Sequence, residues 1–158
     1  MADNIQSFIK ELAFEEALTH HLLGHGWNEV IMNPTEEQLV ENWARIIYDC
    51  NREIDKLGNH PLTASEMQQV MDKVNMVGSP YEMNRFINAQ EVCIKRDNEA
   101  DTNNCGKEVY LKIFDPMEIS SGQSRYQIAR QPKFKSADER GGDRRGDVML
   151  LINGMPVI

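Results

Sequence analysis

The sequence predicts an α/β protein in which helices come first and strands follow, an order also found in α+β proteins. Apolar residues recur at the spacing of amphipathic helices in the first half of the chain, and three capping-box motifs occur there. In the second half, apolar residues alternate with polar ones, as in half-buried strands. We therefore expect one domain over residues 1–158, with a helical part at 1–90 and a mixed or antiparallel sheet at 91–158.

The composition is typical of a soluble globular protein. The chain has 158 residues, of which 41% are hydrophobic and 27% are charged. No apolar run approaches the roughly 20 residues that span a membrane, and the acidic, polar N-terminus does not resemble a secretory signal. The three cysteines, Cys50, Cys93 and Cys105, are far apart and form no CxxC pair. This usage favours the reducing cytoplasm over a disulfide framework or a thiolate zinc site.

Capping boxes mark the starts of three of the four expected helices. In such a box a Ser or Thr side chain accepts a hydrogen bond from the backbone three residues later, and the Glu or Gln found there bonds back. The first helix has no box and ends at Gly24 and Gly26. The expected helices are Ser7–Gly24, Thr35–Gly58, one that starts at Thr63–Glu66 and continues through Val74, and one that starts at Ser79–Glu82.

Four strands are expected in the second half, separated by polar loops at Asp97–Gly106 and Ser136–Gly146. Asn153-Gly154 follows the last strand and supplies the two positive φ values of a type I′ hairpin turn. The expected strands cover Val92–Lys95, Val109–Ile113, Ser124–Gln131 and Val148–Ile152. The last of them is uniformly apolar, which predicts a buried strand.

The hairpin after Asn153-Gly154 is unfinished, because the chain stops at Ile158 as the partner strand begins. A natural domain seldom ends with a buried strand whose backbone groups lack partners. We therefore expect the chain to be a fragment of a longer protein.

Asp147 stands at the head of the last expected strand, after a segment rich in arginine and lysine. The net charge of −8 argues against a general nucleic-acid binder, but basic residues outnumber acidic ones between Arg125 and Arg145. A carboxylate placed there could hold a divalent cation against a phosphate, because Mg²⁺ prefers hard oxygen ligands. The alternative is that Asp147 only ends the preceding turn.

Other chemical motifs are weak. His20, His21 and His25 invite a metal-dependent hydrolase interpretation, but no HExxH pattern accompanies them, and ordinary surface histidines are the simpler interpretation. The chain carries no GxxxxGK[ST], GxGxxG or GxSxG motif, so it supplies no phosphate loop or serine nucleophile of a known type.

Six runs of residues together resemble the N-terminal region of the R subunit of type I restriction enzymes. The last run is the most specific of them. The runs are Leu39–Trp43, Pro61–Met67, Phe86–Asn88, Ile94–Asn98, Gly122–Ile128 and Arg144–Ile158. That region of the family is similar to the PD-(D/E)xK nucleases, so the resemblance implies a fold of this kind.

The resemblance implies catalytic roles for Asp147 and Glu15. Asp147 matches the first nuclease motif and would ligate Mg²⁺, while Glu15, followed by Gly26-Trp27, matches an N-terminal helical glutamate. Glu16 is an equally good match for that glutamate. The family's second motif, an acidic residue two before a lysine, would follow the Asn-Gly hairpin and is absent up to Ile158. We therefore expect an incomplete nuclease fold that does not cut DNA by itself.

The resemblance also implies partners. The parent subunit would use ATP in separate motor domains to pull double-stranded DNA before cutting it, together with specificity and methyltransferase subunits. Lys133, Lys135, Arg144 and Arg145 are candidate phosphate contacts, which would position DNA without reading bases; a solvated loop is the alternative for them. The alternative function is a non-catalytic helical module whose acidic N-terminal helices dock onto another protein.

Overall fold

The computed structural model describes residues 2–82, 91–113, 124–135, 144–145 and 147–157. The chain divides into two units, one formed by Met1–Leu39 with Arg125–Ile158 and the other by Val40–Ser124. Helices and strands occur in both units, which confirms the α/β class. The single domain over 1–158 stays a prediction. No helix in the described part of the chain is long and apolar enough to cross a membrane.

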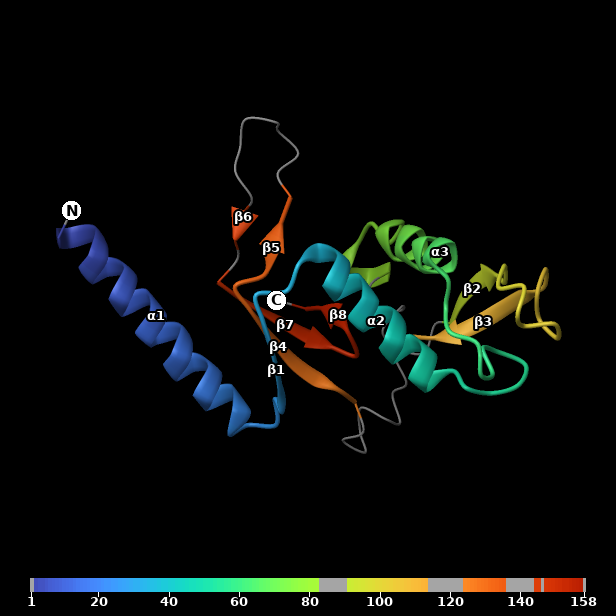
Figure 1. Ribbon diagram of the computed structural model, residues 1–158, viewed down its shortest axis with the longest axis horizontal. Coiled ribbons are helices and arrows are strands. Elements are labelled where there is room, and N and C mark those ends of the chain that lie inside the picture. Colours follow the sequence, from blue (N-terminus) through green and yellow to red (C-terminus); the bar gives the residue numbers. More distant parts are fainter. Residues whose placement is uncertain (1, 83–90, 114–123, 136–143, 146, 158) are drawn as a thin grey trace. The chain divides into compact units, whose positions relative to one another are not determined.

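The first unit contains a mixed sheet of four strands in the order β1-β4-β7-β8 (Figure 1). Its strands are β1 (Glu29–Met32), β4 (Tyr126–Arg130), β7 (Val148–Ile152) and β8 (Met155–Pro156). β4 pairs parallel with β1 and antiparallel with β7. The sheet is therefore mixed, as predicted, but β1 lies within the part expected to be helical. Its residues, Glu-Val-Ile-Met, do not alternate between apolar and polar, and its partner lies almost a hundred positions away.

β4 is the buried centre of this sheet. Gln127, Ile128 and Ala129 are fully buried, and the Gln127 side chain donates a hydrogen bond of 2.9 Å to Glu29 Oε2 on β1. A buried amide needs such a partner because an unpaired one would be costly. β4 therefore fixes the position of Arg130 at its end and of Gln131, which follows.

The hairpin between β7 and β8 turns at Asn153-Gly154, as predicted. The φ angles of Asn153 and Gly154 are 51° and 84°, and the buried Asn153 exchanges two hydrogen bonds of 2.9 Å with the backbone of Arg125. The expectation of a wholly buried β7 is wrong, because Leu151 is its only buried residue and the rest are half-buried. Apolar composition does not reveal whether a second layer covers a strand.

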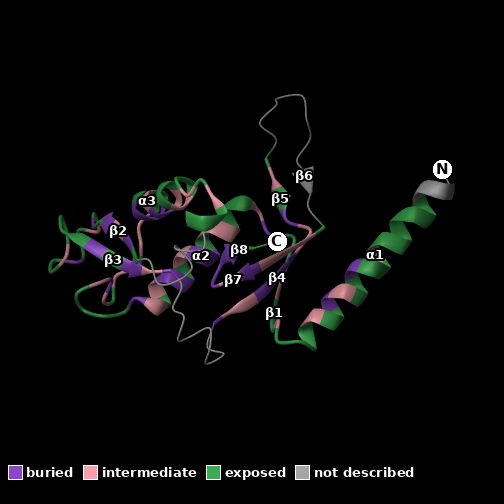
Figure 2. Cartoon of the chain, turned by 180° about the vertical axis from the view of Figure 1, so that it is seen from behind, coloured by how far each residue is buried: buried purple, intermediate pink, exposed green. Residues whose placement is uncertain are grey.

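α1 (Ala2–Leu23) ends immediately before Gly24, as its glycines predict, but the predicted start at Ser7 is wrong because the helix begins at Ala2. No capping box marks the start of this helix in the sequence. Among its described side chains only Glu15 and Thr19 are buried, and Figure 2 shows how much of the helix is exposed. Large apolar side chains such as Phe8 and Phe14 are exposed by 55% and 69%. The buried stripe of α1 therefore carries a carboxylate, and much of its apolar surface lies outside that stripe.

The second unit contains an antiparallel ribbon of β2 (Glu91–Lys95) and β3 (Glu108–Lys112), which packs against α3 (Ala64–Asn75). One face of the ribbon is buried and consists of Val92, Ile94, Val109 and Leu111. Gln69 of α3 holds the ribbon through two hydrogen bonds, because its side-chain oxygen accepts from the Lys95 N–H at 2.8 Å and its nitrogen donates to the Lys95 carbonyl at 3.0 Å.

α2 (Glu36–Cys50) begins where predicted but ends earlier than Gly58. The buried Asn51 side chain donates to the carbonyls of Ile47 at 2.8 Å and Lys112 at 2.9 Å, and accepts from the Lys112 N–H at 2.8 Å. A side-chain amide that bonds backbone groups in this way competes with the helix. The predicted continuation of the helix is therefore wrong, and Ile54 in that continuation is 77% exposed.

All three predicted capping boxes form hydrogen bonds. The boxes at Thr35 and Thr63 are reciprocal, with bonds of 2.9–3.2 Å between Thr35 and Gln38 and between Thr63 and Glu66. In the third, the Glu82 N–H donates to the Ser79 hydroxyl at 3.2 Å, and the helix begins at residue 80. Residues 83–90 of this expected helix lie outside the described residues.

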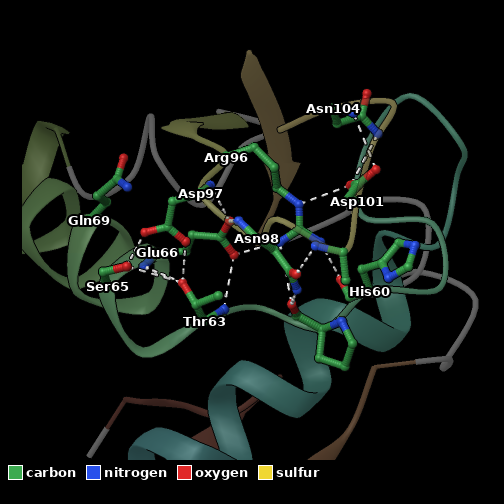
Figure 3. Close-up of polar contacts among 12 residues, drawn as sticks. His60, Thr63, Ser65, Glu66, Gln69, Arg96, Asp97, Asn98, Asp101 and Asn104 are labelled. Carbon is green, nitrogen blue, oxygen red and sulfur yellow. Dashed lines mark hydrogen bonds and ion pairs between the residues drawn. The ribbon is translucent and has the colours of Figure 1, made fainter. Parts of the chain in front are cut away.

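A buried arginine, Arg96, joins the elements of the second unit (Figure 3). It is 1% exposed. Its Nη1 lies 2.5 Å from Glu66 Oε2, and its Nε lies 3.1 Å from Asp101 Oδ2. The guanidinium also donates to the carbonyls of His60 and Pro61. Buried charge is tolerated only with such partners, so this cluster fixes the loops around α3 and the ribbon.

Glu66 connects this cluster to the start of α3. Its Oε2 accepts from the Thr63 N–H at 2.9 Å, which closes the capping box. Its Oε1 accepts from the backbone N–H groups of Asp97 at 2.8 Å and Asn98 at 3.2 Å. One carboxylate therefore caps a helix, neutralises Arg96 and holds the segment after β2. The two segments in contact here, Pro61–Met67 and Ile94–Asn98, are among the runs that resemble the R subunit of type I restriction enzymes.

Replacing Arg96 by methionine should strongly destabilise the protein. Removing one partner of a buried ion pair typically costs about 3–5 kcal/mol because the other charge stays buried, and we expect a loss of that size in urea denaturation. Lys73→Met also replaces a cation by methionine, at an exposed position of α3, and should shift the free energy of unfolding by no more than about 0.5 kcal/mol. A loss for Arg96→Met below about 1 kcal/mol, the range of exposed ion pairs, would contradict this account.

Asp97 should give the stability of the protein a pH dependence. The hydroxyls of Ser65 and Thr63 donate to its carboxylate and hold the pKa of Asp97 below its usual value. Such a group stabilises the fold above the unfolded pKa, about 3.9 for aspartate, and loses that contribution as the pH falls through the folded pKa. In urea denaturation we expect wild type to exceed Asp97→Asn at neutral pH by a margin that narrows in acid. The margin should be small because solvent screens an exposed aspartate, and a margin independent of pH would contradict the prediction.

Candidate functional site

Asp147 lies immediately before β7, at the end of the β4–β7 ladder, and is exposed. The register pairs Arg130 with Val148. The ladder continues one step further, because the Gln131 N–H donates to the Asp147 carbonyl at 2.9 Å. Asp147 therefore stands opposite Gln131, with its carboxylate open to solvent at the edge of the sheet.

Glu15 reaches the same corner from α1. Its Oε2 accepts from Gln131 Nε2 at 3.2 Å and lies 3.6 Å from Arg130 Nη2. Glu15 is 4% exposed, whereas Glu16 is exposed. The two glutamates were equal matches in the sequence; among the described contacts, it is Glu15 that is linked to Asp147, through Gln131. Gln131 bonds Glu15 through its side chain and Asp147 through its backbone.

Arg130 and Gln131 are functional candidates that the sequence analysis missed. The Arg130 side chain is 16% exposed, and its buried Nε has no hydrogen-bond partner among the described residues. Gln131 has a φ of 49°, in the left-handed region, where β4 ends and the chain turns toward the next strand. Their only sequence signal is their place at the end of the expected strand Ser124–Gln131, within the segment where basic residues outnumber acidic ones.

Two short strands, β5 (Lys133–Phe134) and β6 (Arg144–Arg145), form an antiparallel pair. We call this pair the basic ribbon. Its register places Lys133 opposite Arg145 and Phe134 opposite Arg144. The prediction that Ser136–Gly146 is wholly a loop is wrong at its end, because pairing with β5 makes Arg144 and Arg145 a strand. The Lys133 N–H donates to the Pro34 carbonyl at 2.8 Å, which fixes the other edge of β5.

Lys135, the fourth predicted phosphate contact, follows β5 and already has an acidic partner. Its Nζ lies 2.6 Å from Glu37 Oε1, and both side chains are mostly exposed. The hydrogen bond and the charge of Lys135 hold the pKa of Glu37 below its usual value. An exposed pair of this kind is screened by solvent, so a phosphate could compete with Glu37 for Lys135.

Asp147 and Glu15 are of the residue types that could hold a Mg²⁺ ion. Mg²⁺ usually keeps several waters and takes one or two carboxylates, and Asp147 with Glu15 supplies ligands of that type. The part of the chain described here contains no group of three or more His, Cys, Asp or Glu side chains placed to hold a metal. His25 Nδ1 donates to the His21 carbonyl at 2.7 Å, so this histidine helps to close the end of α1.

Known proteins are similar to this chain over nearly its whole length. No family model matches the chain. An endonuclease subunit of a type I restriction enzyme from Staphylococcus saprophyticus is 30% identical over 148 residues, which is 94% of this chain and 14% of that subunit. The chain is related to type I restriction endonuclease subunits. Subunits of the same kind from two strains of Staphylococcus aureus are 27% identical over 152 residues, covering 96% of the chain and 14% of each subunit.

These relatives confirm the resemblance that the residues carry in the sequence. The chain spans about one seventh of the length of the curated relatives it matches, 14% in each case. Their names identify endonuclease subunits of multi-subunit restriction enzymes. The catalytic and DNA-binding roles of residues in this chain remain predictions. All of these residues lie in the unit formed by Met1–Leu39 with Arg125–Ile158.

Proposed function

We propose that this chain forms the nuclease region of a type I restriction endonuclease subunit, with an incomplete PD-(D/E)xK-like fold. The observation that carries the proposal is that Gln131 bonds both Glu15 and Asp147, in a chain related to endonuclease subunits. These two acidic residues are 132 positions apart in the sequence, and both match the carboxylates that the resemblance assigns to the nuclease site.

Asp147 is the proposed Mg²⁺ ligand and Glu15 its supporting catalytic carboxylate. A bound Mg²⁺ would offset the negative charge that develops on a phosphodiester during hydrolysis. Asp147 is exposed and can take such an ion directly, while the Gln131 side chain holds the carboxylate of Glu15. Within the chain, Met155-Pro156-Val157-Ile158 follows the hairpin and contains no acidic residue or lysine. The chain alone therefore lacks a group to orient the attacking water and should not cleave DNA.

The basic ribbon and Lys135 are the proposed contacts to the phosphates of double-stranded DNA. Arg145 stands two residues before Asp147, a separation of at most about 7 Å along the backbone. A phosphate bound at this end of the ribbon would therefore lie close to the Asp147 carboxylate. Phosphate contacts fix the position of the duplex but carry no base sequence information, which agrees with sequence recognition by a separate specificity subunit.

The rest of the proposed parent supplies what this chain does not contain. Motor domains would hydrolyse ATP and pull DNA toward the nuclease site, and specificity and methyltransferase subunits would complete the assembly in the cytoplasm. A non-catalytic interaction module is the second candidate function. It is favoured by the exposed apolar residues of α1, which include Ile5, Phe8, Ile9 and Phe14. On α2, by contrast, Trp43, Ile46 and Ile47 are buried.

Asp147→Asn should abolish DNA cleavage by the longer subunit in its complex. The amide cannot replace a charged Mg²⁺ ligand, so we expect at least about a 100-fold loss in plasmid cleavage with Mg²⁺ and ATP, while ATP hydrolysis continues. Asp72→Asn, an exposed position of α3, is the matched control and should cleave normally. Normal cleavage by Asp147→Asn would rule out the proposed site, and Asp147-dependent cleavage by residues 1–158 alone would contradict the proposed incompleteness.

The double variant Lys133→Ala/Arg145→Ala should weaken DNA binding by the chain. Each phosphate contact contributes about −0.9 to the slope of log affinity against log salt concentration. We therefore expect the slope to become shallower by about 2 in fluorescence anisotropy with a duplex of arbitrary sequence. Lys73→Ala, on the exposed surface of α3, should leave the slope unchanged. An unchanged slope for the double variant would show that Lys133 and Arg145 make no phosphate contacts.

A further inference from the structure

Glu15 is held by two consecutive residues that the proposed nuclease chemistry does not use. Gln131 Nε2 and Arg130 Nη2 both approach the same oxygen, Oε2, at 3.2 Å and 3.6 Å. Among the described residues, no hydrogen bond involves the other oxygen, Oε1. The carboxylate is therefore fixed from one side, and one oxygen stays available to a ligand.

The backbone of Glu15 is tied down as well. Its carbonyl accepts a hydrogen bond of 2.8 Å from the buried Thr19 hydroxyl, one turn later on α1. The side chain leaves the helix at a position that is 4% exposed. Burying a carboxylate without a compensating charge is costly, so Arg130 offsets that cost while Gln131 sets the direction of the carboxylate.

Gln131 also fixes Asp147. Its backbone N–H donates to the Asp147 carbonyl at 2.9 Å, and its φ of 49° directs its side chain out of the regular strand. The backbone of one residue thus places Asp147, and its side chain places Glu15. Both contacts depend on the end of β4, whose interior is fully buried and therefore rigid.

We propose that Arg130 and Gln131 are positioning residues that hold the Glu15 carboxylate beside Asp147, so that the two acidic residues bind one divalent cation together. This inference rests on the proposed function. Arg130 and Gln131 do not touch the cation; they act through Glu15. Partners that orient a metal ligand in this way typically change metal affinity by about 10- to 100-fold when they are removed.

The contact between Arg130 and Glu15 is longer than a typical charge-assisted hydrogen bond. Charge-assisted N–H···O bonds are usually about 2.7–2.9 Å long, whereas Arg130 Nη2 lies 3.6 Å from Glu15 and its buried Nε has no hydrogen-bond partner in the described part of the chain. Arg130 therefore balances the charge of Glu15 from one side, and Glu15 Oε1 has no hydrogen-bond partner among the described residues.

The test measures Mn²⁺ binding by residues 1–158, using isothermal titration calorimetry in place of cleavage. We expect Gln131→Leu and Arg130→Met each to weaken binding by about 10-fold or more. Arg130→Lys keeps a cation within reach of Glu15 and should restore most of the affinity, which a merely space-filling role would not require. Gln68→Leu, on the exposed surface of α3, is the matched control and should bind as wild type does.

A double-mutant cycle separates positioning of Glu15 from other effects. In a Glu15→Gln background, Gln131→Leu and Arg130→Met should cause no further loss, because they act through the group already removed. Additive losses would overturn the inference. Gln131→Leu retains the backbone bond to Asp147, so it keeps the test decisive if Arg130→Met fails to fold, which circular dichroism and urea denaturation would reveal.

The proposed function and the inference fail in different ways. If Asp147→Asn loses Mn²⁺ binding while Gln131→Leu and Arg130→Met bind as wild type does, the inference is overturned and the metal site stands. If Asp147→Asn binds Mn²⁺ as wild type does, the proposed metal site fails and the inference fails with it. The same holds if the wild-type chain does not bind Mn²⁺. Loss in all three variants, with rescue by Arg130→Lys and no additivity with Glu15→Gln, supports both.

Discussion

The antiparallel pairing of β4 with β7 is the constraint on which the candidate site depends. Its register sets Gln131 opposite Asp147, and through the Gln131 side chain it also determines where Glu15 of α1 is held. Beyond this point the same two chain segments continue into the basic ribbon. A slip of one residue would turn every side chain of one strand to the opposite face, so the acidic pair exists only in this register.

The two units each contain a buried carboxylate paired with an arginine, and the pairs differ in how completely they are satisfied. Glu66 and Arg96 are 2.5 Å apart and have backbone and side-chain partners on all sides. Glu15 and Arg130 are 3.6 Å apart, and Arg130 Nε has no partner among the described residues. A saturated pair holds one arrangement, whereas an unsatisfied buried group in a native protein calls for an explanation, and a functional site is where such departures are expected.

Local chemistry made much of the fold predictable. Capping boxes and the Asn-Gly turn depend on residues at most a few positions apart. The boxes at Thr35 and Thr63 formed both of their hydrogen bonds, the box at Ser79 formed the first of its two, and the turn took the two positive φ angles. The prediction for α2 failed where the decision was not local, because Asn51 bonds to Lys112, which is 61 positions away. Arg144 and Arg145 were assigned to a loop for a related reason, since two residues cannot show a strand pattern before their partner is known.

The sequence by itself determined the class of the protein, the starts of the three helices that have capping boxes, the final hairpin and the resemblance that singled out Asp147. Only the tertiary structure showed that Glu15, rather than Glu16, is buried and contacts Arg130 and Gln131. Glu15 and Gln131 are 116 positions apart, and a contact over that distance leaves no periodic or local pattern in the sequence. It arises from the pairing of β4 with its neighbours and from the buried stripe of α1, which are settled only when the chain has folded.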